Sequence, residues 1–299
     1  PVEWEISEIR KFLKIMHGQS QHEVECKNGT YPILGTGGII GNANSYLYDK
    51  PSILIGRKGT IDKPMFIDTP FWTIDTLFYS KIFDNVNIKY LFYIFKIINW
   101  LKYDDSTGVP SLSANTIENI KIIVSTNNLE KQKIAEILDC ATRQVELQEQ
   151  IVDKLKVQKK ALMQKLLTPQ PDWQEVKLGD ICEDIYQPQT VPQKEFKNNG
   201  YKVYGANGFI GFYDKYNHKE WQVVLSCRGD CGTINKTEPE SWINGNAMVL
   251  KMEGNELIDK NYFYYQCLAT SFKDVIDNSG IPQITRTPLL KKNFRFIKN

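Results

Sequence analysis

The stretch NNLEKQKIAEILDCATRQVELQEQIVDKLKVQKKALMQKLLTPQP, residues 127–171, decides how this chain is divided. It contains no glycine, no proline before Pro169, and mostly residues with high helix propensity. Asn127 or Asn128 is suited to cap the start of a helix, and Thr168 followed by prolines is suited to end it. We therefore predict one continuous helix of about 40 residues, roughly 60 Å long at about 1.5 Å per residue.

Apolar residues on this helix alternate four and three residues apart once the polar members Gln148 and Lys159 are counted. The resulting heptad seam consists of Ile134, Leu138, Ala141, Val145, Val152, Leu155, Leu162 and Leu166. A heptad seam indicates pairing with another long helix. The alternative is an amphipathic helix that packs along one flanking domain. The predicted helix is longer than either flanking domain is expected to be wide, which favours a spacer between the domains.

The sequences on the two sides of the spacer repeat each other in order. YPILGTGGIIG (31–41) matches YKVYGANGFIG (201–211), and GVPSL (108–112) matches GIPQI (280–284). Between these matches, GRKGT aligns with CRGDCGT and places Arg57 opposite Arg228. Ordered matches at a nearly constant spacing indicate a duplication.

Each copy begins with short apolar runs that end at glycines, which is typical of strands with tight turns. Helices are predicted later, at 87–102 and 259–275, and a strand is predicted to follow, as at 117–124. We therefore predict an α+β fold class: two duplicated α+β domains joined by a long coiled-coil-type α-helix. The predicted boundaries are residues 1–126, 127–168 and 169–299.

Composition excludes few classes of partner. The formal net charge of +2 is close to neutral and neither demands nor excludes a polyanion. The six cysteines show no disulfide framework and no signal peptide precedes them, so a cytoplasmic location is expected. The most apolar run, residues 88–101, is too short to span a bilayer and contains Lys89 and Lys96, so no membrane partner is expected.

Catalytic motifs are not found in the sequence. Cys227 and Cys231 lack a second cysteine or histidine pair that would complete a zinc site. The three histidines do not accompany a recognisable nucleophile and acid, and no glycine fingerprint for a nucleotide follows a strand. We therefore predict no catalytic residues, no metal and no cofactor, with any chemistry carried by partner subunits.

A DNA-reading protein needs donors for base edges, cations for phosphates and turns that let the backbone approach the duplex. Glycine-rich loops with basic and amide side chains meet this need in both copies. The candidate DNA-binding residues are Gly37, Gly38, Arg57, Lys58, Thr60, Asn207, Arg228, Thr233, Gln283 and Arg286. Amide side chains suit adenine and arginine suits guanine or phosphate. The alternative is that the arginines are surface charges and the glycines only form turns.

The domain–helix–domain order resembles the specificity subunits of Type I restriction-modification systems. The resemblance covers the whole chain and rests on the helix start LEKQKIAEIL, its end LMQKLLT, the opening WE and WQ segments, and the STGVP and NSGIP exits. It implies two target recognition domains for double-stranded DNA, each reading half of a split target in a DNA methylation and host-defence system. It also implies a non-catalytic subunit whose helices pair as an antiparallel coiled coil and dock methyltransferase (modification) subunits and, indirectly, the restriction subunit.

Members of that family usually carry a second long helix after the second domain, and this sequence stops at FRFIKN, where that helix would begin. We therefore expect a second chain, in a homodimer through the spacer helix, or methyltransferase helices to cover the seam. Because the loops of the two copies differ, an asymmetric bipartite target is expected. Two alternatives stay open: a recognition fragment of a fused restriction-methylation enzyme, and a protein-binding scaffold.

Overall fold

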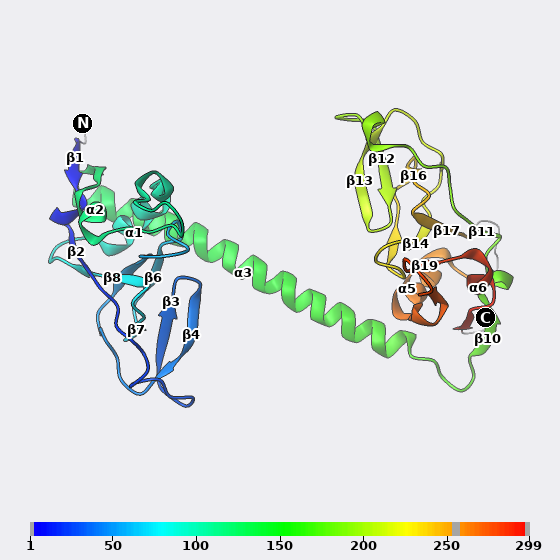
Figure 1. The fold of residues 1–299 in the computed structure, drawn as a ribbon, viewed down its shortest axis with the longest axis horizontal. Coiled ribbons are helices and arrows are strands. Elements are labelled where there is room, and N and C mark those ends of the chain that lie inside the picture. Colours follow the sequence, from blue (N-terminus) through cyan, green and yellow to red (C-terminus); the bar gives the residue numbers. More distant parts are fainter. Residues whose placement is uncertain (1–2, 253–257, 297–299) are drawn as a thin grey trace. The chain divides into compact units, whose positions relative to one another are not determined.

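The computed structural model describes residues 3–252 and 258–296. The chain divides into two compact units, residues 1–151 (unit 1) and 152–299 (unit 2) (Figure 1). The long helix α3 spans Asn128–Leu167, as predicted, and belongs to unit 1 in its first part and to unit 2 in its last. The three-part division at 126 and 168 remains a prediction.

Unit 1 combines three small sheets with short helices. Its elements are β1 (Trp4–Glu8), β2 (Leu13–Met16), β3 (Tyr31–Gly35), β4 (Gly38–Ala43), β5 (Ser52–Gly56), β6 (Met65–Ile67), β7 (Trp72–Thr73), β8 (Leu77–Ile82), α1 (Ile88–Ile97), α2 (Ala114–Asn119) and β9 (Lys121–Ser125). The strands form the sheets β2-β8-β5-β6, β4-β3-β7 and β1-β9. The antiparallel β1–β9 pair joins the start of the unit to the strand before α3.

Unit 2 repeats this plan. Its elements are β10 (Gln174–Lys177), α4 (Leu178–Ile181), β11 (Asp184–Tyr186), β12 (Tyr201–Gly205), β13 (Gly208–Tyr213), β14 (Val223–Ser226), β15 (Ile234–Lys236), β16 (Trp242–Ile243), β17 (Ala247–Lys251), α5 (Lys260–Ala269), β18 (Ile276–Asp277), β19 (Gln283–Ile284), α6 (Arg286–Leu290) and β20 (Asn293–Phe296). The sheets β11-β17-β14-β15, β13-β12-β16 and β10-β20 correspond one by one to those of unit 1. Even the parallel pair recurs, as β3–β7 and β12–β16, so the predicted duplication is confirmed.

Three predicted element boundaries were wrong. The helix predicted at 87–102 ends at Ile97, because Ile98 is extended, and a short 3-10 helix follows at Trp100–Tyr103. The helix predicted at 259–275 likewise ends at Ala269. The strand predicted to begin at residue 117 is preceded by α2, because the Ser113 hydroxyl accepts the Thr116 N–H at 3.0 Å and caps a helical turn there.

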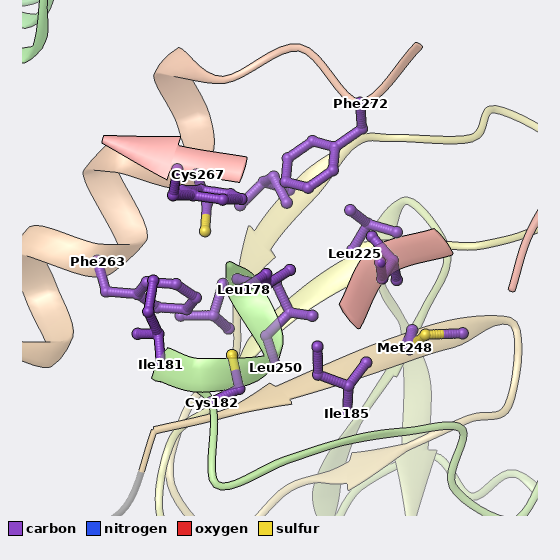
Figure 2. Packing of buried hydrophobic residues seen from close by; sticks show 14 of the residues in the cluster. Leu178, Ile181, Cys182, Ile185, Leu225, Met248, Leu250, Phe263, Cys267 and Phe272 are labelled. Atoms are coloured by element: carbon purple, nitrogen blue, oxygen red, sulfur yellow. The ribbon is translucent and has the colours of Figure 1, made fainter. Parts of the chain in front are cut away.

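The core of unit 2 lies between the four-stranded sheet and the helices α4 and α5. Figure 2 shows Phe263 of α5 beside Leu178 and Ile181 of α4, with Leu250 of β17 close to them. Phe263 is completely buried. Aromatic and aliphatic side chains from helices and strands thus close one contiguous core.

Replacing Phe263 by Ala is expected to destabilise unit 2 by about 3 to 5 kcal/mol, because the substitution removes buried apolar surface and leaves a cavity. Chemical denaturation followed by circular dichroism measures the loss. Limited proteolysis should show cleavage beginning in unit 2 while unit 1 persists. The matched control is Tyr265→Ala on the same helix, where the ring is partly exposed. Equal stability of the two variants would contradict the core assignment.

The start of α3 is held by unit 1. The Asn127 side chain accepts the N–H groups of Leu129 at 2.9 Å and Glu130 at 3.3 Å, which caps the helix. Tyr93 donates its hydroxyl to Asp139 at 2.6 Å. Ile134 is half-buried against the core of unit 1 and therefore belongs to that core more than to a free seam.

Beyond this point the seam residues of α3 lie on the surface. Leu138, Ala141 and Val145 are exposed on the part of α3 in unit 1, and the same holds for the seam residues Val152, Leu155, Leu162 and Leu166 in unit 2. This exposure does not favour the alternative of a helix packed along one flanking domain. Within the described residues, no helix combines the length and apolar character needed to cross a membrane.

Candidate nucleic-acid interface

Three segments of unit 1 meet beside the end of β5. Residues 57–60 follow β5 and pair with residues 110–112, since Gly59 N–H donates to the Pro110 carbonyl and Leu112 N–H to the Arg57 carbonyl, both at 2.9 Å. The third segment is the tip of the β3–β4 hairpin, where the Thr36 hydroxyl would lie 3.9 Å from a Cβ on Gly59. We call these three segments the loop patch of unit 1.

Unit 2 builds the same loop patch from residues 227–233, 282–284 and 206–208. Ile284 N–H donates to the Cys227 carbonyl at 3.0 Å, and the backbones of Arg228 and Gln283 form an isolated antiparallel β-bridge. The hairpin tip is tied in by Asn235, whose side-chain amide donates to the Ala206 carbonyl at 3.3 Å. The stretches GVPSL and GIPQI are therefore repeated because each supplies one side of a loop patch.

Backbone hydrogen bonds correct the alignment of the two copies in this patch. Arg57 N–H donates to the Thr76 carbonyl at 2.8 Å, and in unit 2 the corresponding bond runs from Cys227 N–H to the Asn246 carbonyl at 3.2 Å. Arg57 thus corresponds to Cys227 and not to Arg228. The Arg57 guanidinium donates to the Asp75 carbonyl at 3.3 Å, whereas burial raises the pKa of the Cys227 thiol.

The structural counterpart of Arg228 is Lys58. Both lie in isolated bridges with the proline-containing segment, and both precede a glycine with positive φ, Gly59 at 88° and Gly229 at 74°. The alignment of Arg57 with Arg228 was wrong by one residue. The loop of unit 2 is longer, and the sequence by itself allows the insertion to be placed on either side of Arg228. Both exposed cations therefore occupy one equivalent position.

In each unit an aspartate carboxylate accepts hydrogen bonds in the turn that precedes the proline-containing segment. The sequence patterns did not identify these aspartates. Asp104 accepts the Ser111 N–H at 2.8 Å and also the Ser106 N–H and hydroxyl, and these hydrogen bonds lower the pKa of Asp104. Asp277 accepts the Ser279 N–H at 2.9 Å, and hydrogen bonds from Ser279 lower its pKa in the same way. Aspartate two residues before serine is the local signal that identifies such turns.

The remaining candidates divide between patch and surroundings. Gly37, Gly38 and Asn207 occupy the hairpin tips, and a Cβ added at Gly37 or Gly38 would meet no atom within 4 Å. Thr60 and Thr233 are half-buried at the loop ends. Arg286 starts α6 and pairs with Asp184 at 2.8 Å, so its charge is already partly neutralised.

Two consecutive apolar residues after each tip glycine were also missed. Ile39 and Ile40 in unit 1 and Phe209 and Ile210 in unit 2 are exposed. Their signal in the sequence is the break in the alternation expected of a strand with one buried face. Beside the loop of unit 1 lies a depression of about 300 Å³ whose lining includes Arg57.

Within residues 3–252 and 258–296, no three His, Cys, Asp or Glu side chains are arranged to hold a metal ion. His218, the least exposed of the histidines, contacts the Tyr186 hydroxyl at 2.8 Å and the Asn217 side chain at 2.6 Å. Stacking on Tyr186 further fixes its ring. This histidine therefore stabilises the loop before β14.

Comparison with known proteins gives the family. Residues 1–157 and 170–296 match the Type I restriction modification DNA specificity domain. The chain belongs to this family. Each of the two matches covers one repeat, so each unit contains one DNA specificity domain, and the fold class predicted from the sequence is confirmed.

Solved structures share the fold of this specificity-domain protein. The crystal structure of a Type-I restriction-modification system S subunit from M. genitalium superposes with a TM-score of 0.81 at 17% identity, over 99% of this chain and 85% of that one. A structure described by the complex assembly and conformational transition of the type I R-M system superposes with a TM-score of 0.50 at 12% identity, over 100% and 87%. At these identities the likeness concerns the fold.

Proposed function

We propose that this chain is the sequence-recognition subunit of a Type I restriction-modification complex and reads a bipartite, asymmetric DNA target. Unit 1 reads one half of the target and unit 2 the other. The observation that carries this proposal is the loop patch, which both repeats build with corresponding backbone hydrogen bonds at Arg57 and Cys227 but with different side chains.

The side chains that differ between the patches support asymmetry. Lys58 faces Ser111 in unit 1, where Arg228 faces Gln283 in unit 2. Arginine recognises guanine through two hydrogen bonds and glutamine or asparagine recognises adenine, whereas lysine binds guanine or phosphate as a point charge. Asn207 adds an amide at the tip of unit 2, where unit 1 has Gly37. Different donors imply different half-sites.

The exposed seam of α3 supports assembly with partner subunits. Each large apolar side chain left in water forgoes about 1.5 to 3 kcal/mol of burial, so a run of such residues favours a bound partner. We propose methyltransferase subunits, and through them the restriction subunit, as partners, with a second copy of α3 as the alternative cover. The structure that resembles this chain at a TM-score of 0.50 concerns complex assembly in such a system. In this proposal the length of α3 sets the unread gap between half-sites.

Replacing Lys58 or Arg228 by Ala is expected to weaken binding to the target by about 1 to 3 kcal/mol and to relax specificity in one half-site only. Methylation mapping by single-molecule sequencing identifies the target, and gel shifts with the assembled methyltransferase complex measure affinity for half-site variants. Exposed lysines outside the patches, in Lys50→Ala and Lys215→Ala, serve as matched controls.

A palindromic methylation motif would contradict the asymmetric target. Unchanged binding and sequence preference in both Lys58→Ala and Arg228→Ala would contradict the assignment of the loop patches. A wild-type complex with no preference among random duplexes would favour the scaffold alternative. Methyltransferase motifs in the same open reading frame would favour the fused enzyme.

A further inference from the structure

Each hairpin tip presents two consecutive apolar residues that its own unit leaves exposed. Ile39 is 70% and Ile40 53% exposed in unit 1, and Phe209 is 51% and Ile210 45% exposed in unit 2. Single exposed apolar residues are common on protein surfaces and need no explanation. Packing within the units covers these pairs only in part: the Phe209 ring contacts the Phe212 ring at a centroid distance of 5.1 Å and Phe209 is still 51% exposed.

A β-bulge shapes the tip of unit 1. Leu34 of β3 pairs with Ile39 of β4, but the preceding residue Ile33 pairs with Gly41, so Ile40 is the extra residue of the bulge. Bulges redirect side chains and are typical of functional edges. The bulge therefore turns Ile40 out of the strand alternation and leaves it exposed beside Ile39.

The tip of unit 2 has the same bulge. Tyr204 pairs with Phe209 and Val203 with Gly211, which leaves Ile210 as the extra residue. A glycine makes room for it, because a Cβ at Gly205 would lie 3.1 Å from the Ile210 Cδ1 atom. In unit 1 a Cβ at Gly35 would lie 3.6 Å from the Ile40 Cδ1 atom and 3.4 Å from its Cγ2 atom, which is an ordinary van der Waals contact. The bulged isoleucine thus lies against the glycine before the tip in both repeats, and the contact is tight enough to favour glycine in unit 2.

The surroundings of these pairs favour nucleic acid as the partner. The tips belong to the loop patches, whose exposed side chains include the cations Lys58 and Arg228. In DNA, phosphates that attract cations lie beside base edges that a small apolar pair can contact. The apolar core of a protein interface, by contrast, is depleted of charged residues. A two-stranded ribbon fits the major groove, where the thymine C5-methyl group is the apolar feature.

We propose that the hairpin tips read thymine methyl groups in the major groove, through Ile39 and Ile40 in one half-site and through Phe209 and Ile210 in the other. This assignment rests on the proposed function, and it adds apolar contacts with bases to the polar contacts of the loop patches. It assigns sequence preference to residues that carry neither charge nor hydrogen-bonding groups. Ile39 in one tip corresponds to Phe209 in the other, so the two tips present side chains of different shape to the methyl groups.

The test uses the assembled methyltransferase complex and its mapped target duplex. Ile40→Ser and Phe209→Ser are measured against wild type on the target, on an unrelated duplex, and on targets with uracil replacing thymine one position at a time. The matched control is Ile97→Ser, another exposed isoleucine at the end of α1. Affinities are compared at several salt concentrations, since a lost phosphate contact changes the salt dependence and a lost methyl contact does not.

Each tip variant is expected to bind the target roughly tenfold more weakly than wild type, with unchanged salt dependence and unchanged affinity for the unrelated duplex. Replacing one thymine of the matching half-site by uracil should weaken wild-type binding by the same factor as the tip substitution. The same replacement should not weaken binding of the tip variant any further. Wild-type affinity in both tip variants, or a half-site without an A·T pair, would overturn the inference and leave the proposed function standing. Loss of methyltransferase binding instead of DNA affinity would also overturn it, by identifying a protein partner. A wild-type complex without target preference would reject the proposed function itself.

Discussion

Replacing Leu155 and Leu162 together by Glu is expected to abolish assembly of the chain with its helical partner while both units remain folded. The two leucines lie one heptad apart on the seam of α3, are 56% and 48% exposed and lie outside the core cluster of unit 2, so the substitution leaves that core intact. In the complex it removes about 3 to 6 kcal/mol of apolar burial and places two carboxylates in an apolar interface. Together these effects correspond to a loss of more than about 100-fold in affinity.

Co-purification with methyltransferase subunits and sedimentation of the purified chain measure this effect. The control is the double variant Leu147→Glu and Val157→Glu, which changes two exposed apolar residues of the same helix that lie off the seam. Circular dichroism should show folded protein in both cases. If the seam variant still assembles, or if the control fails equally, the heptad seam is not the partner surface.

Lengthening α3 by one heptad is expected to change the target more than any single substitution. A second copy of residues 145–151 adds seven residues, or about 10 Å of helix, and keeps the seam in register. At about 3.4 Å per base pair the unread gap should widen by about three base pairs, with both half-sites unchanged. If a second copy of α3 covers the seam, it carries the same added heptad.

Methylation mapping of cells that express the lengthened chain reads out the new target directly. A four-residue insertion at the same place is the control, because it turns the following residues about 40° further around the helix and breaks the seam. We expect the control to assemble poorly. A changed half-site with an unchanged gap would show that α3 does not set the spacing.

Local patterns in the sequence were sufficient for the large-scale plan. The absence of glycine between residues 128 and 167, together with the cap at Asn127, predicts α3 because helix propensity and capping depend on neighbours a few residues away. The duplication was readable for a similar reason, since tight turns need glycine at fixed places and both copies retain it at the hairpin tips. By contrast, the partners of the seam and the DNA contacts remain predictions.

Only the tertiary structure decided which side chains share the loop patches. The equivalence of Lys58 with Arg228 depends on backbone hydrogen bonds between segments about fifty residues apart, and no local pattern records such pairing. The exposure of Ile40 depends on a bulge, which is a property of two strands in register and not of one. Propensity and periodicity act along the chain, so they determined the elements and their repetition. The surface that faces a partner was decided by contacts across the chain, because folding alone brings distant residues within hydrogen-bonding distance.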